Sequence, residues 1–82
     1  MQLKDFKYEA KETKKQLLVE NGVYLSCRRA KEILVLLFQI HNFYVEVYFD
    51  AQEEMIGYMK AFEDPNLLDP YLETIDLSAL LN

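Results

Sequence analysis

The sequence predicts a small α+β domain: an N-terminal helix, a four-stranded antiparallel meander and a C-terminal helical segment, packed as two layers. Before Gly22 the apolar residues recur every three or four positions, and after Gly22 they alternate with a period of two. Two Asp-Pro pairs then precede short apolar runs, a pattern typical of helix starts. Because 82 residues allow only one hydrophobic core, we expect a single domain over residues 1–82.

The N-terminal helix is expected over residues 3–20, with lysines and acids on its solvated side. Its apolar positions are Leu3, Phe6, Ala10, Thr13 and Leu17. Asn21 and Gly22 are expected to end the helix, because glycine adopts the left-handed conformation of a helix C-terminus without steric cost.

Four strands are expected over residues 23–30, 33–40, 43–50 and 55–62. Residues 43–50 alternate between apolar and polar or tyrosine side chains, and residues 33–40 are almost continuously apolar, which is typical of a central strand. His41 and Asn42 form a two-residue hairpin connection in which Asn42 can tolerate a positive φ. In the resulting register Ile40 lies opposite Phe43. The pairing then continues one residue at a time along both strands, to Ile33 opposite Asp50.

This register divides the sheet into two faces. The apolar face carries Leu34, Leu36, Phe38, Phe43, Val45, Val47 and Phe49. The other, which we call the tyrosine face, carries Tyr24, Ile33, Val35, Leu37, Tyr44, Glu46 and Tyr48. A helical segment over residues 65–81 holds too many leucines to remain in water, so we expect it to join the N-terminal helix on the apolar face. The alternative is that one helical element crosses to the tyrosine face and gives three layers.

The charge pattern disfavours nucleic acid as a partner. The net charge is −5, and phosphate binding depends on lysine and arginine. Arg28, Arg29 and Lys31 could contact phosphates beside the tyrosines, but Glu46 and Asp50 share that face and would repel them. Residues 1–45 sum to +3 and residues 46–82 to −8. The two halves either neutralise each other within the fold or favour self-association.

No motif predicts catalysis, a metal or a cofactor. Cys27 and His41 are the only cysteine and histidine, and we expect a core thiol and a turn residue, respectively. Asp50, Glu53 and Glu54 lack the spacing and glycine of a calcium loop, so we interpret them as solvated charges. We therefore expect a protein that is not an enzyme.

The sequence also favours a cytoplasmic protein without a membrane segment. A single cysteine allows no intrachain disulfide, which favours a reducing compartment. Residues 1–7 lack the apolar core of a signal peptide, and the longest apolar run, residues 33–38, is too short to cross a bilayer.

The segments FYVEVYFD, residues 43–50, and PYLETIDL, residues 70–77, resemble stretches in short uncharacterised proteins of Bacteroidetes-type bacteria. The resemblance covers about residues 20–81. It implies a bacterial cytoplasmic protein and no activity, cofactor or catalytic residue.

These observations favour a non-catalytic interaction or assembly module. The most direct hypothesis is a homodimer, or a complex with another protein, joined through an uncovered tyrosine face. The alternative is a small-ligand-binding or regulatory domain whose pocket is lined by the same tyrosines.

Overall fold

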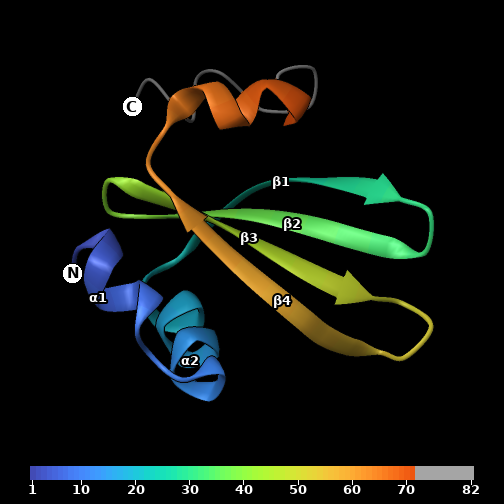
Figure 1. Ribbon diagram of the computed structural model, residues 1–82, viewed down its shortest axis with the longest axis horizontal. Helices are drawn as coiled ribbons and strands as arrows, with labels where there is room; N and C mark the ends of the chain where they lie inside the picture. Colours follow the sequence, from blue (N-terminus) through green and yellow to red (C-terminus); the bar gives the residue numbers. More distant parts are fainter. Residues whose placement is uncertain (72–82) are drawn as a thin grey trace.

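The fold is α+β, as predicted, with one open antiparallel sheet between helical elements (Figure 1). The structure, a computed structural model, describes residues 1–71, so the expected helical positions 72–81 lie outside the described residues. The elements are α1 (Leu3–Lys7), α2 (Lys11–Asn21), β1 (Val23–Ala30), β2 (Ile33–Ile40), β3 (Phe43–Asp50), β4 (Met55–Phe62) and the 3-10 helix η1 (Pro65–Tyr71). None of the helices in this part of the chain has the length and apolar character needed to cross a membrane.

The N-terminal region forms two helices instead of the single helix expected over residues 3–20. The chain leaves α1 at Tyr8 and re-enters a helix after Ala10, whose backbone is extended (φ −67, ψ 156). A straight helix would place Phe6 and Leu18 about 18 Å apart along its axis. The break instead lets both side chains enter one core cluster, where Phe6 is fully buried and Leu18 nearly so.

Gly22 ends α2 for a different reason from the one expected. Its backbone is extended (φ −80, ψ 143), not left-handed, and its N–H donates a 2.8 Å hydrogen bond to the Leu18 carbonyl oxygen. A Cβ atom at this position would lie only 2.5 Å from the same oxygen. Glycine is therefore favoured by a close approach of the backbone to the last turn of the helix.

The four strands have the predicted bounds and pair in the order β1-β2-β3-β4. All eight predicted β2–β3 pairs are confirmed, from Ile40 opposite Phe43 to Ile33 opposite Asp50. The positive φ at the turn belongs to His41 (53°) and not to Asn42, and Lys31 (58°) has the same role between β1 and β2. Type II′ turns have a positive φ at the first of their two central residues and a negative φ at the second, which is the pattern seen here.

A β-bulge in β1 changes which residues share a face. Leu25 has no partner on β2, so the alternation reverses between Tyr24, which pairs with Phe38, and Ser26, which pairs with Leu37. Tyr24 therefore lies on the apolar face, where its ring centroid is 5.7 Å from that of Phe38, and not beside Tyr44 as expected.

Helical elements cover both faces of the sheet, so the two-layer arrangement was wrong and the three-layer alternative describes residues 1–71 (Figure 1). Helices α1 and α2 pack on the apolar face around Phe43 and Val45. Leu68 and Tyr71 of η1 pack on the tyrosine face against Val35 and Leu37.

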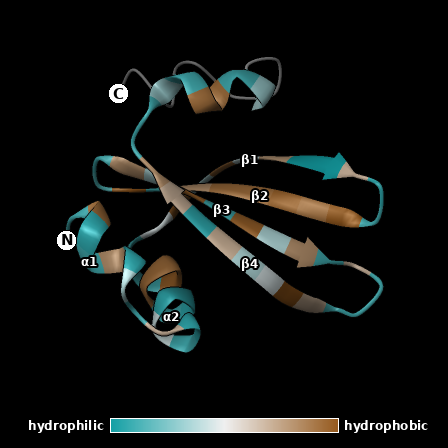
Figure 2. Ribbon diagram, viewed as in Figure 1, coloured by the Kyte–Doolittle hydropathy of each residue, from teal (hydrophilic) through white to brown (hydrophobic). Residues whose placement is uncertain are grey.

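The composition of β2 explains why a single covered face is insufficient. This strand is hydrophobic along almost its whole length (Figure 2), so apolar side chains project from both sides of the sheet. Phe62, the last residue of β4, packs on the tyrosine face, and the chain continues from there into η1.

Candidate interaction surfaces

A buried polar cluster lies beneath η1 and is centred on Glu46 of β3. This carboxylate is 5% exposed, and three side chains from three elements bind it. The Tyr71 hydroxyl donates to Oε2 over 2.5 Å, the Arg28 Nη2 donates to the same oxygen over 3.4 Å, and the Tyr48 hydroxyl donates to Oε1 over 3.4 Å. Glu46 thereby connects η1, β1 and β3.

The electrostatics of this cluster keep its hydroxyl donors protonated. Burial raises the pKa of Tyr71, and its hydrogen bond to Glu46 adds to the effect. Burial and the neighbouring Glu46 charge raise the pKa of Tyr48 in the same direction. Partial desolvation opposes the charge of Arg28, but hydrogen bonds to Tyr71 and Glu46 raise the pKa of Arg28 overall.

Arg28 also supports η1 directly. Its Nε donates to the Tyr71 hydroxyl over 3.3 Å, and its Cζ lies 5.6 Å from the centroid of the same ring. Because both Glu46 oxygens accept hydrogen bonds from protein groups, we interpret this cluster as a support for η1 and not as a ligand site.

The tyrosine face is not the open surface that the sequence suggested. Val35 and Leu37 are fully buried, because η1 covers the centre of this face. Ile33, Tyr44 and Tyr48 are half-buried and pack around the same cluster. The Tyr44 ring stacks on Phe62 with a centroid distance of 5.6 Å, and the Tyr48 ring lies 5.5 Å from that of Tyr58.

The apolar face, in contrast, keeps an open groove of about 290 Å³ between α2 and the sheet, which we call the α2 groove. Its lining consists of Lys15, Leu18, Val19, Leu36, Phe38, Val47 and Ile56. Val19 is 85% exposed at its rim, and Tyr24, which contacts the lining residue Phe38, is 54% exposed. One feature of the sequence indicates this groove. Val19 is apolar but lies outside the spacing that predicts the buried side of the helix, so it is expected to project into solvent.

A second open region follows the outer edge of β4 and is basic. One hollow of about 350 Å³ is lined by Lys7, Lys14, Tyr58, Met59, Lys60 and Ala61. An adjoining hollow of about 180 Å³ is lined by Lys11, Lys14, Gly57, Tyr58 and Met59. We call the two together the β4 groove.

Among residues 1–71, no carboxylate forms an ion pair with a lysine of the β4 groove. Within residues 1–71 the ion pairs are Lys15 with Glu12 and Arg28 with Glu46, and only the second joins the two halves. Within residues 1–71, this part of the surface therefore carries lysines without an ion-pair partner.

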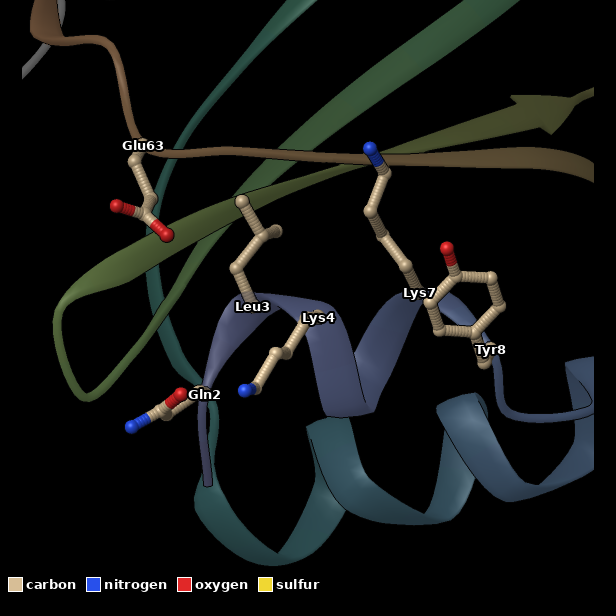
Figure 3. Close-up of a pocket in the computed structure, with 6 residues that line it drawn as sticks. All are labelled: Gln2, Leu3, Lys4, Lys7, Tyr8 and Glu63. Carbon is tan, nitrogen blue, oxygen red and sulfur yellow. The ribbon is translucent and has the colours of Figure 1, made fainter.

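A third hollow of about 270 Å³ lies beside α1 and is drawn in Figure 3. Leu3 and Lys7 extend from α1 toward β4, Glu63 approaches from the segment after β4, and Lys4 points the other way (Figure 3). All the charged groups that line this hollow are exposed to solvent. Since no buried polar group lines it among the described residues, nothing there would orient a ligand.

The residues considered for catalysis or metal binding are dispersed. Cys27 is exposed and is not a core thiol, and among residues 1–71 its strand β1 has a neighbour on one side only. Cys27 pairs with Leu36, about 13 Å along β2 from the turn that holds His41. The Asp50 Oδ1 accepts hydrogen bonds from the backbone of Gln52 and Glu53, and so organises its own loop. Across residues 1–71, no three His, Cys, Asp or Glu side chains gather as metal ligands.

Comparison of the chain with models of protein families, with curated proteins and with solved structures gave no match.

Proposed function

We propose that this chain is a non-catalytic interaction module that forms a homodimer through the α2 groove. The observation that carries the proposal is the lining of this groove, in which Lys15 is the only residue with a polar side chain. An open apolar surface of this kind on a small domain is typical of a protein interface.

The lining favours an apolar side chain over a small polar ligand. Sites for small molecules have volumes of about 300–1,000 Å³ and several convergent polar groups that fix the orientation of the ligand. The α2 groove, at about 290 Å³, lies just below this range, and Lys15 contributes the one ammonium group of its lining. The rings of Tyr44 and Tyr48, on which the ligand-binding alternative depended, already pack against Phe62 and Tyr58.

A second copy of the chain fits because the groove and its projecting neighbours lie on the same surface. Val19 and Tyr24 project from α2 and β1 beside the hollow that Leu36 and Phe38 help to form. A two-fold axis that sets the Val19 of each copy into the groove of the other would give the self-complementary interface of a homodimer. Burial of one such side chain contributes about 1.5–3 kcal/mol.

Substitution of Val19 by aspartate tests the homodimer. The native side chain is 85% exposed in the single chain, so Val19→Asp should preserve the circular dichroism spectrum while placing a charge in the interface. Sedimentation across a range of protein concentrations should give a dimer for the wild type and a monomer for the variant. The control is Tyr8→Asp, whose side chain is 90% exposed and lies outside the groove, and it should remain dimeric.

Two results would overturn this proposal. One is a wild-type chain that stays monomeric at every concentration, and the other is an unchanged mass for Val19→Asp.

A further inference from the structure

The outer edge of β4 has the features of a site that accepts an additional strand. Among residues 1–71, β4 is the last strand of the sheet and pairs only with β3, so half of its backbone groups have no strand partner in this part of the chain. The Ile56 carbonyl oxygen instead accepts a hydrogen bond from the Lys11 ammonium group. A carbonyl of this strand is therefore accessible to a donor from outside the sheet.

The charges beside this edge specify the chemistry of a partner. The residues that line the β4 groove include Lys7, Lys11, Lys14 and Lys60, and no carboxylate is among them. Lys7 extends toward β4 (Figure 3), and neither Lys7 nor Lys60 forms an ion pair within residues 1–71. The groove therefore presents unneutralised positive charge next to unpaired backbone.

We propose that the β4 groove binds an acidic segment of a partner protein, which adds to β4 in an extended conformation. Backbone hydrogen bonds to β4 would supply affinity, as in other cases of strand addition. Side chains of an extended segment alternate between its two sides, so acidic residues at every second position would face Lys7, Lys11 and Lys14 on the side of the sheet that α1 and α2 cover. The exposed Tyr58 ring, on the sheet face opposite that of Met59, is available to the apolar side chains between them.

An acidic peptide suits this groove better than a nucleic acid. All the cations that line it are lysines, and the chain as a whole carries a net charge of −5, which repels a long phosphate backbone. A short acidic segment interacts with the lysines of the groove without approaching the acidic remainder of the surface. It also forms hydrogen bonds with the backbone of β4.

This inference is independent of the homodimer, because the β4 groove and the α2 groove share no lining residue. Loss of the dimer in Val19→Asp would leave peptide binding intact. Loss of peptide binding would likewise leave the mass of the dimer unchanged.

The test is fluorescence anisotropy with a labelled peptide of alternating glutamate and valine, as long as β4, added to the full chain. We expect saturable binding that weakens with salt. The double variant Lys7→Glu/Lys11→Glu should weaken it by at least about tenfold, because two attractive contacts on one side of the segment become repulsive. Both native side chains are exposed, so the variant should fold, and circular dichroism checks that it does.

Three controls separate strand addition from general attraction. Arg29→Glu/Lys31→Glu makes the same change in net charge at the opposite edge of the sheet, and it should bind the peptide like the wild type. A peptide with N-methyl groups on alternate amides should bind at least about tenfold more weakly if its backbone pairs with β4. An oligothymidylate of equal length should bind more weakly than the acidic peptide.

Any of four results would overturn the inference. These are the absence of wild-type binding, equal losses in the two double variants, unchanged binding of the methylated peptide, and tighter binding of the oligothymidylate.

Discussion

Removal of the Tyr71 hydroxyl should destabilise the protein far more than removal of a similar hydroxyl on the same face. Tyr71→Phe preserves the fully buried ring but leaves Glu46 without its shortest hydrogen bond, at 2.5 Å. A hydrogen bond to a buried charge contributes about 1.5–3 kcal/mol. We expect the free energy of unfolding to fall by about that amount, which lowers Tm by roughly 6–24 °C in a domain of this size.

Urea unfolding followed by circular dichroism measures this loss, and an unchanged m value shows that the unfolded state is comparable. The matched control is Tyr44→Phe, because the Tyr44 hydroxyl makes no hydrogen bond within residues 1–71 and its ring stays stacked on Phe62. It should change stability by less than about 0.5 kcal/mol. Equal losses in the two variants would refute the conclusion that Glu46 holds η1 through Tyr71.

Two further predictions concern pH and backbone geometry. Burial raises the pKa of Tyr71 above the ordinary value of about 10, so at higher pH the unfolded state binds fewer protons than the folded state and stability falls. The difference in unfolding free energy between wild type and Tyr71→Phe should therefore shrink between about pH 9 and 11, and a constant difference would contradict this. Gly22→Ala should cost about 1–3 kcal/mol in urea unfolding, because its Cβ would lie 2.5 Å from the Leu18 carbonyl oxygen. Gly57→Ala, with its nearest atom at 3.9 Å, should instead gain about 0.4–1 kcal/mol, and similar effects at the two glycines would count against this explanation.

The sheet was predictable because its determinants are local. The alternation in residues 43–50 and the two-residue turn at His41 and Asn42 together fix the β2–β3 register, and all of its pairs are confirmed. The β1 bulge was not predictable in this way. Leu25 fits a regular alternation in sequence, and only the pairing with β2 leaves it without a partner and moves Tyr24 to the apolar face.

The placement of the helical elements depended on long-range packing, which periodicity does not encode. Val35 and Leu37 on one side of β2, and Leu36 and Phe38 on the other, indicate that both faces need cover. The pattern does not, however, specify which helical element covers which face.

The polar cluster is partly encoded in the sequence. The predicted register already placed Glu46 opposite Leu37, in an apolar environment where a carboxylate requires partners. Arg28 on the neighbouring strand could have been proposed as one. Tyr71 could not, because its position follows from the path of the chain after β4.

The succession of neighbouring strands has a consequence for how the chain acquires its structure during synthesis. Each strand pairs with the one that precedes it, so the hairpins can form in order as the chain leaves the ribosome. The face of the sheet that carries Val35 and Leu37, however, remains exposed to solvent until Leu68 and Tyr71 have left the ribosome and can cover it. We expect nascent chains in that interval to be the form most prone to aggregate and the form that chaperones recognise.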